Sequence, residues 1–311
     1  MSNVEKFSQL ASSLDCPPAV DAPVLERITP HSTEVGGIQV NRVLPRRQRR
    51  LIGAWCFLDH IGPVSGREIN MHVGAHPHIG LQTFTWVMEG EILHCDSLGT
   101  EQVIRPGQVN LMTAGRGIAH TEDSLAEQQA MHAAQLWIAL PKEHADTEPR
   151  FDHYPDLPRW REQNMDMTLL IGSYAAYTAP TKSFSPLVGV DLQAIQAGQV
   201  SLELRADFEY GLLPLQGEWK IEGEIFAEND LAYLGCGREQ LVLENPANGR
   251  ALLVGGTPMK HEILIWWNFV GHSRDVIIQA QRDWEAGDKN RFPDVPGATN
   301  RLAPPPIPWR E

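Results

Sequence analysis

The chain has 311 residues, enough for two domains of ordinary size. Its 39 acidic residues outnumber its 26 basic ones, and the formal net charge of −13 argues against a nucleic-acid partner held by phosphate contacts. No apolar run is long enough to span a membrane, and the first 18 residues lack the apolar core of a signal peptide, so we expect a soluble, cytoplasmic protein.

Two features of the composition have ordinary interpretations. The arginine cluster RRQRR, at residues 46–50, is interpreted as a solvated surface turn, because short charge runs are usually exposed. The four cysteines are far apart and include no CxxC pair. This spacing predicts free thiols in a reducing compartment rather than a disulfide framework or a zinc ribbon.

Short apolar runs bounded by Gly, Pro, Asn or Asp recur along the chain and predict many short strands. In chain order, strands are expected at residues 82–87, 102–104, 109–112, 135–140, 167–171, 200–204, 231–234, 240–243 and 251–254. Helical periodicity is scarce. The pattern therefore predicts an all-β protein built from sandwiches or barrels.

One helix is predicted near the C-terminus, at residues 273–286. Ser273 is a favourable capping residue, and Gly287 is placed to end the helix. Apolar residues between 276 and 284 fall near one face, so we expect the helix to pack on the outside of a barrel. The proline-rich residues 301–311 predict an extended arm.

The chain is expected to divide into two related barrels. Residues 142–160 are polar and contain prolines, and a second break follows at residues 178–186. A weak internal repeat links VMEGEILH to LQGEWKIE, and IRPGQVNLMTAG to FAENDLAYLGCG. We therefore expect an N-terminal domain at residues 1–160 and a C-terminal domain at residues 161–311, with the boundary between residues 142 and 185.

Two short motifs indicate a metal site. AHPHIG contains His76 and His78, and AHTED contains His120 and Glu122. Residues two apart in a strand point to the same face, so two neighbouring strands would aim four ligands at one point. Three neutral imidazoles and one carboxylate suit a first-row divalent metal. A six-coordinate ion would keep two positions open for water, substrate or dioxygen.

Other histidines have weaker patterns. His94 and Asp96, in LHCDSLG, also share a strand face and could be ligands, but they precede a turn, and we favour a turn-stabilising or rim role. His60, His72 and His132 have no partner at an informative spacing. Between residues 154 and 260 the sequence has no histidine, so the second barrel is expected to be free of metal.

The stretches HPHIGLQTFTWVMEGEILHCDSLG and IRPGQVNLMTAGRGIAHTED, with IWWNFVGHSRDVIIQAQRDWEAG near the C-terminus, resemble the pirin family of the cupin superfamily. The resemblance implies two stacked cupin (jelly-roll-like) barrels, with metal in the N-terminal barrel only. It also implies that His76, His78, His120 and Glu122 are the ligands, and that iron is the metal. Many pirins have Glu where this chain has Gln82, and a neutral amide is a poorer ligand. We therefore expect Gln82 to form hydrogen bonds next to the metal ligands, and the difference to alter substrate choice or metal affinity.

Some pirins are similar to quercetin 2,3-dioxygenases, and others act as regulatory partners of transcription factors or metabolic enzymes. We therefore expect a dioxygenase acting on a flavonol-like phenol, with Fe(II) most favoured and Ni, Zn, Mn or Cu as substitutes. Glu122 would be the general base. Gln82, Phe84 and Trp86 share the parity of His76 and would line the substrate pocket if no bulge intervenes. The alternatives are an iron-dependent interaction protein without turnover and, less favoured, a small-molecule sensor.

Overall fold

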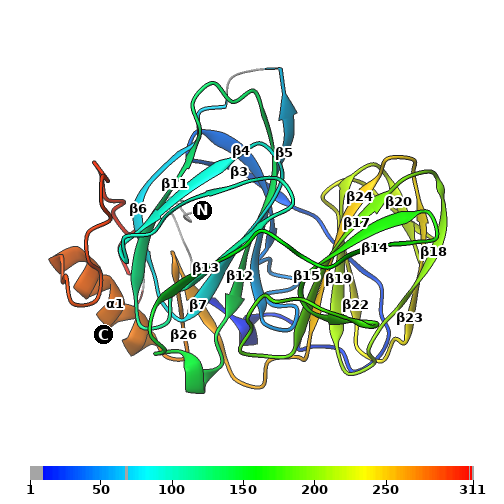
Figure 1. Ribbon diagram of the computed structural model, residues 1–311. Helices are drawn as coiled ribbons and strands as arrows, with labels where there is room; N and C mark the ends of the chain where they lie inside the picture. Colours follow the sequence, from blue (N-terminus) through cyan, green and yellow to red (C-terminus); the bar gives the residue numbers. More distant parts are fainter. Residues whose placement is uncertain (1–9, 67–68, 308, 310–311) are drawn as a thin grey trace.

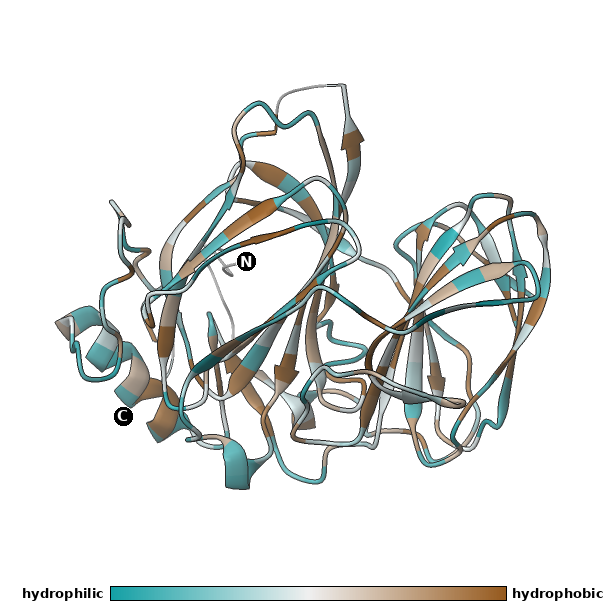
Figure 2. Ribbon diagram, in the orientation of Figure 1, coloured by the Kyte–Doolittle hydropathy of each residue, from teal (hydrophilic) through white to brown (hydrophobic). Residues whose placement is uncertain are grey.

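The computed structural model describes residues 10–66, 69–307 and 309, and shows two β-barrels side by side (Figure 1). Apolar and polar positions alternate along many of the strands, as expected where one face is buried (Figure 2). The all-β prediction is confirmed, and each of the nine predicted strands overlaps an observed one. No helix among the described residues is long and apolar enough to cross a membrane.

The first barrel is built from two antiparallel sheets, with strand orders β13-β10-β7-β12-β5-β4-β3 and β6-β11-β8-β9. The seven strands of the larger sheet are β3 (His31–Val35), β4 (Ile38–Leu44), β5 (Trp55–Ser65), β7 (Leu81–Glu89), β10 (Val109–Thr113), β12 (Ala130–Ala139) and β13 (Arg150–Tyr154). The four strands of the smaller sheet are β6 (His72–His78), β8 (Ile92–Asp96), β9 (Glu101–Ile104) and β11 (Ile118–Ser124).

The second barrel has the same plan. Its larger sheet runs β14-β15-β17-β24-β19-β22-β2, with β16 paired to β15, and its smaller sheet runs β18-β23-β20-β21. The strands are β2 (Glu26–Ile28), β14 (Arg159–Glu162), β15 (Met165–Tyr174), β16 (Tyr177–Thr178), β17 (Leu187–Ala194), β18 (Gly198–Glu203), β19 (Glu209–Gln216), β20 (Trp219–Ile221), β21 (Glu224–Phe226), β22 (Leu231–Gly235), β23 (Gln240–Asn245) and β24 (Arg250–Gly256). Its interior is a closed apolar cluster, and no candidate metal group among the described residues lies there.

The remaining elements cover the first barrel. They are β1 (Ala11–Ser12), β25 (Leu264–Trp266) and β26 (Phe269–Gly271) in one small sheet, the helix α1 (Arg274–Ala286), and the 3-10 turns Ser13–Asp15 and Lys142–His144. Helix α1 lies outside the first barrel, on the side away from the second (Figure 1). Its predicted ends are confirmed, since Ser273 caps it and Gly287 ends it at φ 70°.

The C-terminal arm protects the free edge of β6, the outer strand of the smaller sheet. The Leu302 backbone N–H donates to Ala75 O at 2.8 Å, and the Ala75 N–H donates to Asn300 O at 3.0 Å. Pro77, which has no N–H to donate, is tolerated on such an edge strand. Two segments therefore do not follow the domain boundary predicted at residue 160. The C-terminal arm comes after that boundary but covers the first barrel. Strand β2 comes before it but pairs with β22 of the second barrel.

A continuous apolar core joins the two barrels, and it includes Trp55 and Phe84 of the first barrel and Leu170 and Leu252 of the second. The arginine cluster lies beside this core, and its interpretation as a solvated turn is wrong for Arg49, which is only 1% exposed.

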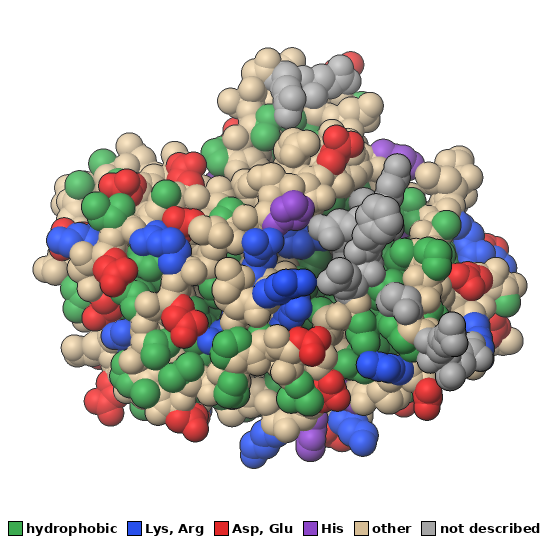
Figure 3. Space-filling model, turned by 180° about the vertical axis from the view of Figure 1, so that it is seen from behind, with side chains coloured by type: hydrophobic (Ala, Val, Ile, Leu, Met, Phe, Trp, Pro, Cys, Tyr) green, Lys and Arg blue, Asp and Glu red, His purple; other side chains and the backbone are tan. Residues whose placement is uncertain are grey.

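Arg49 is buried because the segment before β2 folds over it. Its guanidinium donates to Pro17 O and Pro18 O, both at 3.0 Å, and to Glu26 at 3.1 Å. It also lies 3.8 Å from the centre of the Tyr233 ring. On the rear face, acidic and basic side chains are interspersed, apart from a group of basic side chains near its centre (Figure 3).

A histidine pair at the contact between the barrels makes stability depend on pH. His60 Nε2 lies 2.9 Å from His132 Nε2, and His60 Nδ1 lies 2.6 Å from the Asn229 side chain of the second barrel. Burial, reinforced by the His60 ring, lowers the pKa of His132 to about 3. The unfolded chain takes up this proton near its ordinary pKa of about 6.5, so stability is lost as pH falls from that value toward 3.

We expect His132→Gln to remove about 2 kcal/mol of the stability difference between pH 7 and pH 5, since the amide cannot titrate. Urea unfolding of both proteins at the two pH values measures this difference. An identical pH dependence in the variant would show that His132 is not held neutral in the folded protein.

Candidate metal centre

The two predicted ligand motifs lie on neighbouring antiparallel strands. His76 and His78 are on β6, His120 and Glu122 are on β11, and the register places His120 opposite His76. A bulge separates His120 from Glu122. The glycine-rich turn before β11 needs Gly115, whose φ is +50° and whose added Cβ would lie 1.9 Å from Thr147 O.

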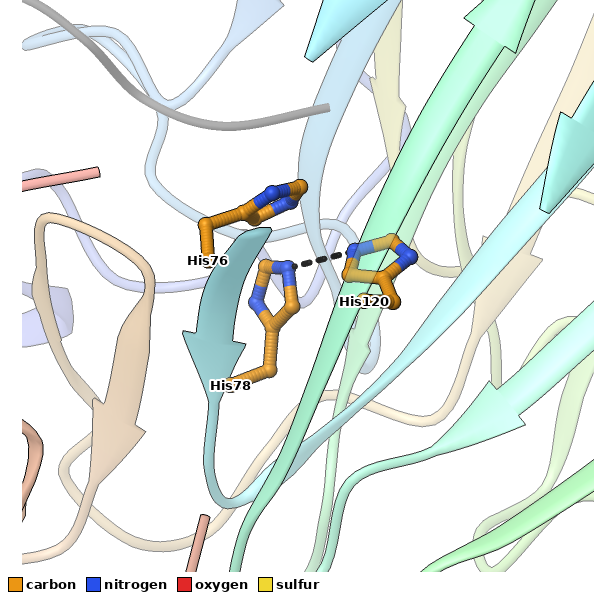
Figure 4. Close-up of side chains that lie close together, drawn as sticks. All are labelled: His76, His78 and His120. Carbon is orange, nitrogen blue, oxygen red and sulfur yellow. Dashed lines mark hydrogen bonds between the residues drawn. The ribbon is translucent and has the colours of Figure 1, made fainter. Parts of the chain in front are cut away.

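The three imidazoles converge inside the first barrel (Figure 4). All three are fully buried, and one ring nitrogen of each lies within 4.8 Å of those of the others. His78 Nε2 is 3.1 Å from His120 Nε2. Two nitrogen ligands placed at 90° around one ion, each at about 2.1 Å, lie about 3.0 Å apart, so this separation suits a shared metal.

Backbone carbonyls fix the tautomers of the β6 ligands. His76 Nδ1 lies 2.8 Å from Gly74 O, and His78 Nδ1 lies 3.0 Å from Asn268 O. Since a carbonyl only accepts, each Nδ1 carries the proton and each Nε2 presents a lone pair to the cluster. His76 Nε2 is buried and has no hydrogen-bond partner among the described residues. A cation would satisfy this orphaned atom, so the residues present fit a metal.

Burial keeps these imidazoles neutral. It lowers the pKa of His76 to about 3, and it lowers the pKa values of His78 and His120 well below the ordinary value. A neutral imidazole is the form that binds a metal. The cluster is therefore ready to bind a cation at neutral pH.

Glu122 and His94 extend the cluster beyond His120. The ligand atoms of His94, His120 and Glu122 form a second group within 4.8 Å, which shares His120 with the first. The turn or rim role expected for His94 is wrong, because the structure places its ring in the site, stacked on Phe151 with ring centres 4.5 Å apart. Its β8 position lies directly opposite Glu122 on β11.

The turn-stabilising role predicted for Asp96 is confirmed. Its Oδ1 accepts the backbone N–H groups of Leu98 at 2.9 Å and Thr100 at 3.0 Å. Burial alone would raise the pKa of this carboxyl, but hydrogen bonds from His94 and from the Thr100 backbone hold it below its ordinary value.

The structure corrects the prediction that Gln82, Phe84 and Trp86 line the metal pocket. Gly80 turns the chain between β6 and β7, which belong to different sheets, so the parity of His76 is not carried into β7. Phe84 and Trp86 instead belong to the core between the barrels. Gln82 donates to Thr113 Oγ1 at 3.0 Å and to Lys182 O at 3.5 Å, rather than to one of the histidines as predicted.

Two residues of β12, Trp137 and Gln135, line the interior of the first barrel in place of Gln82, Phe84 and Trp86. Trp137 lies against His78 with ring centres 5.1 Å apart and stacks on Phe57 at 4.0 Å. Gln135, two residues earlier and on the same face, accepts from Thr85 Oγ1 at 2.9 Å. Trp137 Nε1 and Gln135 Nε2 are buried donors without a hydrogen-bond partner in the described part of the chain. Nothing in the sequence beyond the pattern of an apolar strand indicates a role for them in the site.

Comparisons with known proteins point to one family. Residues 37–138 match the family model described as Pirin, and residues 189–292 match the model described as Pirin C-terminal cupin domain. A Pseudomonas aeruginosa protein named "Putative quercetin 2,3-dioxygenase PA1205" is 55% identical, with 100% of this chain and 99% of that protein covered. A "Pirin-like protein" of Caulobacter vibrioides is 36% identical, with coverages of 84% and 93%. The crystal structure of a quercetin 2,3-dioxygenase from Acinetobacter baumannii superposes with a TM-score of 0.89 at 44% identity, covering 92% of this chain and 97% of that one.

Proposed function

The chain belongs to the pirin family, with two cupin barrels, and we propose that it is a metal-dependent dioxygenase that opens flavonol-like phenols. The metal would be held by His76, His78, His120 and Glu122. The observation that carries the proposal is the convergence of three buried imidazole nitrogens in the first barrel. Relatives named for quercetin 2,3-dioxygenase support the substrate class.

The ligand set favours a first-row metal, and we propose Fe(II) as the native ion. Imidazole suits iron, nickel, copper and zinc, and a carboxylate also suits manganese. Affinity for such a site follows the Irving–Williams order and the supply of metal. Nickel or zinc in purified protein would therefore not contradict iron as the native metal.

The proposed reaction needs the substrate to lose a phenolic proton. A bound divalent metal would supply Lewis acidity that lowers the pKa of that hydroxyl. Glu122 would accept the proton on its carboxylate, as a general base beside His120. The Gly74 and Asn268 carbonyls would keep His76 and His78 oriented.

The unpartnered donors of β12 favour a ligand-binding centre over an ion with a purely structural role. A buried donor left unpaired costs about 1–3 kcal/mol. Trp137 Nε1 and Gln135 Nε2 are two such donors on one inward face, and Trp137 touches a proposed metal ligand. The oxygen atoms of a substrate would accept hydrogen bonds from both donors. An interaction protein without turnover would not need such donors in its interior.

Oxygen consumption by the iron-loaded protein tests the proposed function. Protein purified anaerobically and loaded with stoichiometric Fe(II) should consume dioxygen and bleach quercetin absorbance in equal molar amounts. Apo-protein serves as the control. If fully loaded protein consumes no oxygen with any flavonol, the dioxygenase proposal fails and the iron-dependent interaction protein becomes the leading function.

Trp137→Phe should raise the dissociation constant for quercetin about tenfold, because it removes one buried hydrogen bond worth about 1.4 kcal/mol. The ring keeps its stack on Phe57, so metal content should not change. Anaerobic titration of the metal-loaded protein measures the constant. Unchanged affinity would show that the indole N–H does not contact the substrate.

A further inference from the structure

We propose that Asp96 and His94 are positioning residues that fix the tautomer and orientation of His120 and thereby set the affinity of the metal centre. This inference rests on the proposed metal centre but not on the substrate or the reaction. It assigns to two side chains outside the proposed ligand set a role in holding one of the ligands.

The three residues form a continuous chain of hydrogen bonds. β8 pairs with β11 in a register that sets Asp96 opposite His120. Asp96 Oδ2 lies 3.2 Å from His94 Nε2, and His94 Nδ1 lies 3.2 Å from His120 Nδ1. All three side chains are buried, at 0%, 3% and 0% exposure respectively, so water does not compete for these contacts.

Asp96, at one end of this series of hydrogen bonds, determines which atom donates in each of them. The other Asp96 oxygen already accepts two backbone N–H groups, so this carboxylate acts only as an acceptor. His94 must then donate from Nε2, which leaves its Nδ1 as an acceptor. His120 must donate from Nδ1, which leaves the Nε2 lone pair facing His78 Nε2. Asp96 therefore selects the only His120 tautomer that can bind the metal through Nε2.

His120 differs from His76 and His78 in the group that its Nδ1 contacts. His76 and His78 donate to backbone carbonyls, whereas the partner of His120 leads to a buried carboxylate. A carboxylate behind an imidazole raises its basicity, and loss of such outer partners typically costs about 10–100-fold in metal affinity. Phe151 holds the His94 ring in place by stacking on it.

Asp96→Asn provides the sharpest test. Its amide oxygen can still accept from Leu98 and Thr100, so the turn is kept. Its NH₂ group would donate to His94 Nε2, which reverses both imidazole tautomers and places a proton on His120 Nε2. We expect about 10–100-fold weaker Co(II) binding, measured by competition with a chelator, and an altered Co(II) visible spectrum.

Two His94 variants separate the hydrogen bond from packing. His94→Phe keeps the ring stacked on Phe151 but offers no acceptor, and it should weaken Co(II) binding as much as Asp96→Asn does. His94→Asn places an oxygen near the position of Nδ1, and it should recover most of the lost affinity. Asp123→Asn is the matched control, because Asp123 pairs with His72 on the outer side of β6 and β11.

The outcomes are distinct. If the wild-type protein does not bind Co(II), the metal centre itself fails and this inference falls with it. If the wild type binds and Asp96→Asn binds equally well, the metal centre stands and the positioning role is overturned. If His94→Phe loses as much affinity as His76→Ala while Asp96→Asn is normal, His94 is a ligand instead. Should Asp96→Asn fail to fold, as judged by circular dichroism, the comparison of His94→Phe with His94→Asn decides.

Discussion

His76→Ala is expected to lose more than about 100-fold in metal affinity, beyond the range for loss of an outer-shell partner. The substitution removes a ligand whose Nε2 is buried and has no other partner among the described residues. The change leaves only two of the three converging imidazoles to hold the ion. The double variant His76→Ala/His120→Ala should retain no stoichiometric metal, because each strand then contributes a single ligand.

Metal analysis after equilibration with one equivalent of Co(II) or Fe(II) under anaerobic conditions measures this loss. His72→Ala is the control, since it lies four residues earlier on β6 and its side chain is exposed. Thermal unfolding of the apo-proteins checks that the fold survives. Stoichiometric metal in a well-folded double variant would show that the ligands have been assigned wrongly.

The local parts of this site were predictable from the sequence because they depend only on the period of a strand. His76 and His78 share a face whatever lies beside them. The prediction for Trp86 failed because it extended that parity through Gly80, whose φ of +66° turns the chain into another sheet. No local pattern predicts that His94 lies in the site, because its place opposite Glu122 depends on which strand pairs with β11.

Long-range packing explains the other differences. Arg49 is in a run of basic residues, and its burial depends on carbonyl groups more than 30 positions earlier in the chain. The pairing of β2 with β22 joins segments about 200 residues apart. No local pattern encodes such contacts, whereas α1 was predicted with its ends because a serine cap and a terminal glycine are local signals.

Glu122→Gln should lower the rate of quercetin consumption by about 100-fold or more, the usual range for loss of a general base. The amide keeps the size of the side chain and one acceptor oxygen, but it cannot take the phenolic proton. Metal content should fall far less, because the three imidazoles remain within 4.8 Å of one another. The informative quantity is therefore the rate per bound metal ion, measured from quercetin absorbance and metal analysis on the same sample.

The rate per bound metal ion distinguishes a general base from a metal ligand, because loss of either role lowers the total activity. If Glu122 only binds the metal, activity and metal content should fall together and the rate per metal should be nearly unchanged. If Glu122 is the base, the rate per metal should fall, and it should recover partly at higher pH, where more of the phenol is already ionised in solution. Asp123→Asn, the next residue along β11, removes a carboxylate outside the cluster and should leave both quantities unchanged. A normal rate per metal in Glu122→Gln would exclude the general-base role and leave Glu122 as a ligand alone.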